Sequence, residues 1–505
     1  MTTYRGEQRL SHLERTVAAR DFSFGAAWVD VALAVPEAAE RLVIETLPTT
    51  VSGHRESLAL YLIDPVLVPQ AGASELPNVV LISIDTLRRD HLACYGYARP
   101  TSPNLDAFAA QGALFDSCIA QCSYTLPSHV SMLSGQYPMV HGVRVVDDHI
   151  VAGKTPLLGE ILHAAGYRTA GFAGGLLVHS SYGYERGFDA YADRDPLMNA
   201  QGEQAIARYL EQSVNAPFFL FVHTYGVHDF FASEDSIARF HPGPCASKLH
   251  GKPYLDWGVV SVENGYGEAD RRHLVDLYDA AIANTDGFVG AILSKLRGLG
   301  LDDRTLVIIT ADHGKELLDR GTLAHGHTLY DEMIRVPLMM RGPGIAPQRL
   351  GALVELVDIT PTVVDLVKLA AQEGMQGTSL LPLMHGATEE KLDALSELVA
   401  ATHKLVWRSK VEKLIESTPR DGESGVPEVE LYDLLLDPGE RHALPAASER
   451  GHRLGDQLHR ACELLARRAQ ELGSRTEKTT IDEDLEDLLR QQGYLGKDRG
   501  PARRK

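Results

Sequence analysis

The sequence has few cysteines and no long apolar run. Its 5 cysteines among 505 residues are an odd number without regular spacing, so no disulfide framework is predicted. No window approaches the roughly twenty apolar residues that a membrane span requires. Residues 1–30 contain arginines but no apolar core of a secretory signal. We therefore expect a reduced, cytoplasmic protein without a membrane span.

Positive charge is also scarce. The chain has 49 Lys and Arg against 68 Asp and Glu, which gives a net charge of -19. Such a balance argues against a nucleic-acid partner, because nucleic-acid-binding proteins usually present a basic face. An anionic small-molecule substrate is still compatible with it, since metal ions and histidines set the local charge at a site. The length allows more than one domain and a large core.

Two apolar runs that each lead to an aspartate organise the central part of the chain. Residues 78–84 (NVVLISI) precede Asp85, and residues 305–310 (TLVIIT) with Ala311 precede Asp312. Apolar runs without alternation are typical of parallel strands that are buried on both faces. Helix and strand patterns alternate between and after these runs, which predicts an α/β fold with a mostly parallel sheet sandwiched by helices. We expect both aspartates at the carboxyl edge of this sheet, where ligands of α/β enzymes bind.

Changes in pattern along the chain predict four parts. They are a small β-rich unit with a linker (1–75), an α/β catalytic domain (76–388), an antiparallel α+β subdomain (389–472), and a last helix with a tail (473–505). In the first part, strands are expected at 29–35, 41–46 and 58–63. In the third part, we expect strands at 398–408, 410–416 and 428–434, followed by a helix over 446–472.

A hydroxyl and an imidazole accompany the two acids. Thr125 stands just before a helix predicted over 127–134, and a helix N-terminus favours a phosphate or sulfate group. With Asp85, Asp312 and His313, its Oγ forms a ligand set for one divalent cation, Zn²⁺ or Mn²⁺ in preference to Ca²⁺. Such a metal would lower the pKa of the hydroxyl and prepare it for attack. Taken alone, Asp85 and Thr125 would also suit helix caps.

Several histidines fall in segments that flank these elements. They are His129, His223, His228, His325 and His327. We expect His129, His228, His325 and His327 to contact the substrate. A longer segment, 231–267, carries no readable motif and is expected to contribute to specificity.

The sequence resembles the sulfatase branch of the alkaline phosphatase superfamily. The resemblance covers about residues 77–444 in consistent order, and its segments are 85–97 (DTLRRDHLACYGY), 99–106 (RPTSPNLD), 125–135 (TLPSHVSMLSG), 166–170 (GYRTA), 186–189 (RGFD), 312–314 (DHG), 335–338 (RVPL), 357–362 (VDITPT) and 430–434 (ELYDL). It implies an alkaline-phosphatase-like fold. It also implies that His228 binds the substrate and that His325 contacts the substrate or a second, weaker metal, and both would act as catalytic residues with Thr125.

Four positions depart from the sulfatase pattern, and one of them is Thr86, which leaves a single carboxylate where an Asp pair is common. Sulfatases carry Cys or Ser where Thr125 stands and oxidise it to formylglycine, whereas the secondary alcohol of Thr cannot give that aldehyde. They also have Arg at the position of His129 and Asn at the position of His313. A plain Thr and His313 resemble the phosphoester and phosphonate enzymes of the superfamily.

The resulting hypothesis is a metal-dependent hydrolase of phosphodiesters or phosphonate monoesters that acts through a covalent phospho-threonine. The alternatives are a phosphotransferase with an alcohol acceptor, a sulfate ester hydrolase, and a non-catalytic anion-binding protein of the same fold. The expected partner is a small-molecule ester, with no nucleic acid.

Overall fold

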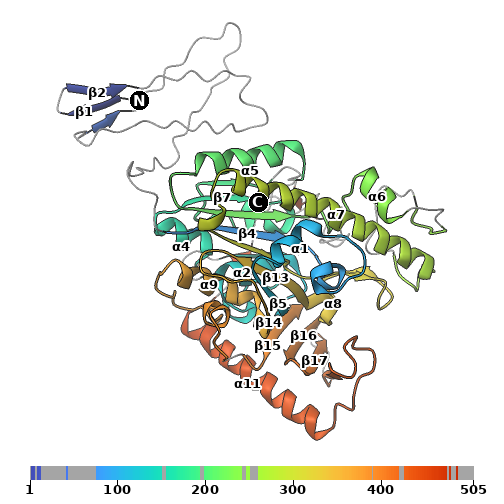
Figure 1. Cartoon of the computed structure of the whole chain (residues 1–505). Coiled ribbons are helices and arrows are strands. Elements are labelled where there is room, and N and C mark those ends of the chain that lie inside the picture. The colour runs from blue at the N-terminus through green and yellow to red at the C-terminus, as the bar shows by residue number, and fades with distance from the viewer. Residues whose placement is uncertain are drawn as a thin grey trace, which may run out of the picture. The chain divides into compact units, whose positions relative to one another are not determined.

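The computed structural model (Figure 1) describes residues 76–150, 155–193, 198–241, 246–250, 260–388, 391–419 and 426–474, and short segments outside them. The chain divides into two compact units, Met1–Ser74 and Glu75–Lys505. In the first unit, an antiparallel sheet has the order β2-β1-β3, with β1 (Thr2–Arg5), β2 (Gln8–His12) and β3 (Arg41–Val43). The strand predicted at 41–46 overlaps β3, no strand is predicted at β1 or β2, and those predicted at 29–35 and 58–63 lie outside the described residues.

An eight-stranded sheet forms the centre of the second unit, in the order β14-β5-β13-β10-β4-β9-β7-β8. Its strands are β4 (Asn78–Ile84), β5 (Ala113–Ile119), β7 (Arg168–Phe172), β8 (Ala190–Ala192), β9 (Phe218–Thr224), β10 (Thr305–Thr310), β13 (Arg335–Arg341) and β14 (Gln348–Glu355). Strand β13 runs antiparallel to both of its neighbours, and the other pairs are parallel. The predicted mostly parallel sheet is therefore confirmed.

Helices cover both faces of this sheet, as predicted (Figure 1). One face carries α1 (Pro103–Ala109), α5 (Ala200–Gln212) and α7 (Glu268–Gly298), and α6 (Glu234–Phe240) packs against α7. The other face carries α2 (Thr125–Ser134), α4 (Leu158–Ala164) and α9 (Ile359–Leu366). Shorter helices are α3 (Pro138–His141), α8 (Asp331–Ile334) and α10 (Leu381–Met384). Within the described part of the chain, no helix combines the length and the apolar character needed to cross a bilayer.

The two central strands bring distant parts of the sequence to one edge. Every residue of β4 and β10 is buried, which explains why both runs lack polar alternation. The strands are parallel neighbours, with Asn78 opposite Thr305 and Ser83 opposite Thr310. The residues that follow each strand therefore emerge together at the carboxyl edge of the sheet.

A separate four-stranded antiparallel sheet follows near the C-terminus. It contains β15 (Ala394–Val399), β16 (Thr402–Arg408), β17 (Glu412–Pro419) and β18 (Glu428–Asp433), and α11 (Glu449–Glu471) packs on it. The single strand predicted at 398–408 is wrong, because the chain reverses between β15 and β16. Two further strand pairs are short: β11 (Glu316–Leu317) with β12 (Leu323–Ala324), and β6 (Asp148–His149) with β19 (Glu477–Lys478).

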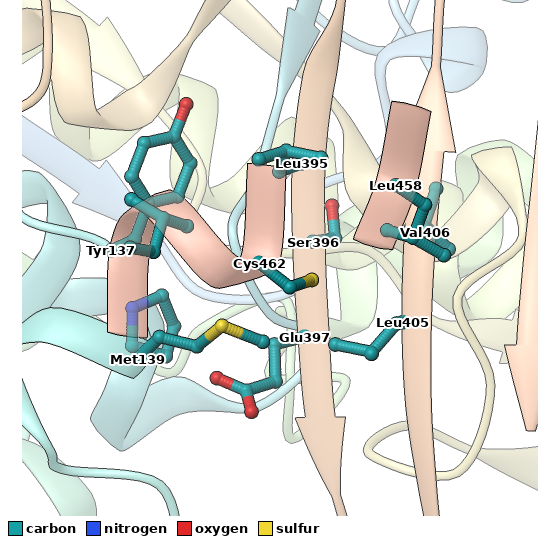
Figure 2. A pocket seen from close by; sticks show the side chains of 11 residues that line it. Tyr137, Met139, Leu395, Ser396, Glu397, Leu405, Val406, Leu458 and Cys462 are labelled. Carbon is teal, nitrogen blue, oxygen red and sulfur yellow. The ribbon is translucent and has the colours of Figure 1, made fainter. Parts of the chain in front are cut away.

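A small cavity marks the junction of this subdomain with the main domain. Figure 2 shows its lining, in which Leu395, Val406, Leu458 and Cys462 lie opposite Tyr137. Its volume of about 10 Å³ is no more than one water occupies. The cavity is therefore a packing defect in the largely apolar contact between the subdomain and the main domain. It has no room for a substrate.

Candidate metal and catalytic site

Four side chains from three distant segments converge at the carboxyl edge of the sheet. Asp85 follows β4, Asp312 and His313 follow β10, and Thr125 is the first residue of α2. Thr125 Oγ1 lies 3.2 Å from Asp85 Oδ2 and 3.2 Å from His313 Nε2. All four side chains have an exposed fraction of 0%. The structure thus brings together the four residues for which the sequence predicts a common site.

Backbone hydrogen bonds hold the two acids in place. The amide of Asp85 donates to the carbonyl of Thr224 at the end of the neighbouring β9, at 3.0 Å. Asp312 Oδ1 accepts hydrogen bonds from the amides of Thr86 at 3.2 Å and His313 at 2.9 Å. One carboxylate oxygen of Asp312 is therefore used for positioning, and the other is left for a ligand.

Close backbone packing supports the same edge. A Cβ on Gly314 would lie 2.0 Å from the carbonyl oxygen of Glu332, so glycine is required directly after His313. Thr86 has a φ of 59°, a left-handed conformation that is uncommon for a β-branched residue. The hydroxyl of Tyr278 on α7 donates to the Thr86 carbonyl at 2.6 Å and so holds this conformation. Backbone strain of this kind is found preferentially at functional sites.

The donor set fits a divalent cation. Asp85 Oδ1, Asp312 Oδ2 and Thr86 Oγ1 are buried and have no hydrogen-bond partner among the described residues. His313 Nδ1 donates to the Gly314 carbonyl at 2.8 Å, which leaves a lone pair on Nε2, 3.3 Å from Asp312 Oδ2. Hydrogen-bond acceptors thus face one another in a dry site, an arrangement that is costly unless a cation compensates it. Two carboxylates and one imidazole suit Zn²⁺ or Mn²⁺.

The two carboxyl groups have opposite pKa shifts. Burial opposes ionisation of Asp85, but the hydrogen bond from His223 and the nearby His228 and His313 hold its pKa well below the usual range. Burial and the negative charge of Asp85 raise the pKa of Asp312 to about 6. The two acids repel each other, so a bound cation would stabilise both as carboxylates.

Two of the predicted histidines lie beside this set. The ring of His325 stacks on that of His313 with centroids 5.0 Å apart, and the ring of His228 meets His325 edge-on at 4.9 Å. His228 Nδ1 donates to Asp229 Oδ1 at 2.6 Å, and Lys315 Nζ donates to the His228 carbonyl at 2.6 Å. Burial lowers the pKa of both His228 and His325, and the Lys315 charge acts in the same direction. Both imidazoles are therefore favoured in the neutral form without a bound anion.

The other two predicted substrate residues have different surroundings. His129 is fully buried, its Nδ1 donates to the Thr125 carbonyl at 2.9 Å, and its Nε2 is 2.9 Å from Ser83 Oγ. Burial lowers the pKa of His129 to about 3, so the ring is neutral. His327 Nε2 donates to Glu316 Oε2 at 3.0 Å. These contacts favour a positioning role for both histidines, and their contact with substrate stays a prediction.

Lys315 is a site residue that the sequence pattern did not indicate. Its side chain has an exposed fraction of 0%, and its Nζ lies 5.2 Å from the centre of the Phe230 ring. Burial lowers the pKa of its amine well below the ordinary value. The nearby charges of Asp229, Asp85 and Asp312 act in the opposite direction but are outweighed. Its place two residues after His313 was the only available signal, because a lysine beside a strand end is usually exposed.

Comparison with known proteins gives a consistent result. The family model described as Sulfatase matches residues 77–369, and that described as N-sulphoglucosamine sulphohydrolase, C-terminal, matches residues 324–468. The chain is 24% identical over 419 residues to a Delta 4,5-hexuronate-2-O-sulfatase of Bacteroides thetaiotaomicron, covering 74% of this chain and 85% of that protein.

Solved structures support the same fold. A phosphonate monoester hydrolase of Agrobacterium radiobacter superposes with a TM-score of 0.65 at 21% identity, covering 78% of this chain and 96% of the other. A protein solved in complex with its substrate D-glucosamine-2-N,6-O-disulfate gives a TM-score of 0.63 at 18% identity, covering 78% and 98%. At these identities the likeness concerns the fold alone.

The fold is an alkaline-phosphatase-like α/β architecture with a separate small antiparallel sheet near the C-terminus. The chain belongs to the sulfatase family, whose model matches more than half of its length. It is therefore a hydrolase of sulfuric or phosphoric esters.

Proposed function

We propose that the protein is a metal-dependent hydrolase of phosphoesters, acting on phosphodiesters or phosphonate monoesters through a covalent phospho-threonine. One observation carries this proposal. The side chain that stands between Asp85 and His313, at the N-terminus of α2, is a threonine, which carries a secondary alcohol. A secondary alcohol can attack phosphorus, as the serine of a phosphatase does, but it cannot be oxidised to the aldehyde on which sulfatases rely.

Asp85, Asp312, His313 and Thr125 would hold the cation, and the buried oxygens without partners favour this assignment. When bound, a Zn²⁺ or Mn²⁺ ion acts as a Lewis acid that lowers the pKa of the hydroxyl and neutralises charge on the ester. The N-terminal end of α2 contributes backbone N–H groups that favour the same anion. The site is thereby arranged for a tetrahedral anion beside Thr125.

Catalysis then uses groups of the chain itself. The Thr125 hydroxyl, oriented by its hydrogen bond to Asp85, loses its proton to solvent as Oγ1 forms a bond to phosphorus and the bond to the leaving oxygen breaks. The leaving alkoxide takes a proton from His228 or His325, and the negative charge of the ester raises the pKa of these imidazoles once it is bound. Water then attacks phosphorus, the bond from Oγ1 to phosphorus breaks, and one proton of the water goes to Thr125. The histidine recovers its proton from solvent, which restores the starting state.

The second metal expected from the family resemblance has less support. Near Asp85, the described residues that lie within ligand distance of one another are Asp312 and His313, and His325 adds a ring stacked on His313. We therefore propose one tightly held ion at this site.

The test is a panel of matched aryl esters with the same leaving group: a phosphate monoester, a phosphodiester, a phosphonate monoester and a sulfate. Metal-depleted enzyme is reconstituted with Zn²⁺ or Mn²⁺, and kcat/KM is measured for each ester. The proposal expects the diester or the phosphonate to react at least about a hundredfold faster than the sulfate, a difference of about 3 kcal/mol in barrier.

Three other results would replace the proposal. Turnover of the sulfate without any phosphoester turnover would establish a sulfate ester hydrolase, which the homology to sulfatases favours. Transfer of the phosphoryl group to an added alcohol in preference to water would establish a phosphotransferase. Ligand binding without turnover of any ester would indicate a non-catalytic protein.

A further inference from the structure

Three histidines form a second cluster, apart from those that the proposed reaction uses. His241 directly follows α6, His273 lies in the second turn of α7, and His250 belongs to the described segment 246–250. Their ring centroids are separated by 5.0 Å (His241 and His273), 5.7 Å (His250 and His273) and 6.3 Å (His241 and His250). One ligand nitrogen from each ring lies within 4.8 Å of the other two.

Two of the ring nitrogens have no hydrogen bond although they are buried. His241 Nε2 and His273 Nδ1 have no partner among the residues that the structure describes. His273 has an exposed fraction of 4%, so water does not easily replace the missing partner. Leaving such a group unpaired in a buried position is unfavourable. A cation between the rings would bind these nitrogens and remove this cost.

A carboxylate behind the cluster fixes one ring in the form that binds metals. His241 Nδ1 donates to Asp276 Oδ2 at 2.7 Å, which leaves the lone pair on Nε2. Arg99 in turn holds Asp276 at 2.8 Å. A carboxylate that orients an imidazole is typical of zinc sites.

We propose that His241, His250 and His273 bind one Zn²⁺ ion at a site separate from that of Asp85. Three imidazoles without a carboxylate ligand select zinc-type metals over Mg²⁺ or Ca²⁺. A tetrahedral zinc keeps its ligand nitrogens about 3.3 Å apart, so the rings close in by about 1.5 Å at most. The exposed His250 supplies this movement. The ion joins His241 and His250 to α7.

The position of His250 in the chain gives the ion a structural role. Residues 246–250 lie in the middle of the connection between β9 and α7, and Ser261 of the same connection pairs with Thr322 between β11 and β12. There, the amide of Val262 donates to the Gly321 carbonyl at 2.7 Å, and the amide of Leu323 donates to the Val260 carbonyl at 3.0 Å. The hairpin leads directly to His325. The ion therefore fixes the middle of a connection whose C-terminal part pairs with a hairpin that borders the active site.

The test counts zinc in protein without an affinity tag. Variants with Asp85→Asn and Asp312→Asn remove the active-site ligands, and zinc per chain is measured after loading and gel filtration. We expect one equivalent in this background, lost on adding His250→Ala and retained on adding His442→Ala. His250 and His442 are both exposed, so neither change disturbs the core.

Thermal unfolding and cobalt spectra supply independent readouts. Zinc should raise the Tm of the Asp85→Asn, Asp312→Asn background by several degrees and should leave the Tm unchanged once His250→Ala is added. Co²⁺ should give the visible absorption of a four-coordinate site in the background alone. Absence of bound zinc in the background, or equal loss with His442→Ala, would overturn the proposal. Neither result depends on which ester the enzyme hydrolyses.

Discussion

Replacing Thr125 tests the proposed nucleophile most directly. Thr125→Ala removes Oγ1 and with it both 3.2 Å contacts, to Asp85 and His313. The side chain is fully buried, so the lost hydrogen bond and methyl group lower the free energy of unfolding by about 1–2 kcal/mol. A domain of this size tolerates such a loss. The variant should therefore fold.

The effect on turnover should be far larger than the effect on stability. Without an attacking oxygen, we expect kcat/KM to fall by about a thousandfold or more, which is about 4 kcal/mol in barrier. Thr125→Ser keeps the hydroxyl and loses one methyl group, so its kcat/KM should stay within about tenfold of the natural enzyme. Thr402→Ala, in β16 of the C-terminal sheet, is the matched control and should have no effect on turnover.

The assay combines steady-state rates with acid quenching during turnover of the best ester. Mass spectrometry of the peptide that contains Thr125 should show one added phosphoryl group in the natural enzyme and none in Thr125→Ala. Turnover by Thr125→Ala within tenfold of the natural rate would refute the reasoning. Equal loss in Thr125→Ser and Thr125→Ala with full metal content would refute it as well.

Three further predictions concern the metal, pH and backbone packing. In Asp312→Asn, turnover should be abolished at a chelator concentration more than about a hundredfold lower than in the natural enzyme, because a charged ligand is lost. Burial, with the nearby charge of an arginine, lowers the pKa of His141 to about 3, so the folded state binds fewer protons than the unfolded state below pH 6.5. From pH 6.5 to 4.5 the natural protein should lose about 2 kcal/mol more unfolding free energy than His141→Gln, as urea titration would show. Gly314→Ala should destabilise by about 1–3 kcal/mol through its clash with Glu332 and weaken metal binding, whereas Gly298→Ala, with open space, should not.

Much of the central fold followed from the sequence because its strands are buried on both faces. The runs of β4 and β10 have no polar interruption, so periodicity identified them directly. Strand β5 (ALFDSCI) was not predicted, since Asp116 and Ser117 break its apolar pattern. The reversal between β15 and β16 was missed because Ala400 and Ala401 carry no turn signal. Tertiary packing determines the secondary structure of such segments.

The site residues were predictable where backbone topology alone places them. Asp85 and Asp312 follow parallel neighbouring strands, so their proximity required only the strand assignment. The details depend on contacts between segments that are distant in the sequence. The Tyr278 hydroxyl on the Thr86 carbonyl and the Lys315 amine on the His228 carbonyl join residues 192 and 87 positions apart. No local pattern carries such information.

Helix α2 has a consequence for how new activities arise in this architecture. All ten of its residues are buried, and Gly135 ends it in a left-handed conformation beneath the Val357 carbonyl. The surrounding protein therefore fixes the path of the backbone whichever small side chain occupies its first position. Randomising the codon for Thr125 would place different nucleophiles on an unchanged backbone. Selection could then change the class of ester that the enzyme hydrolyses without a change of fold.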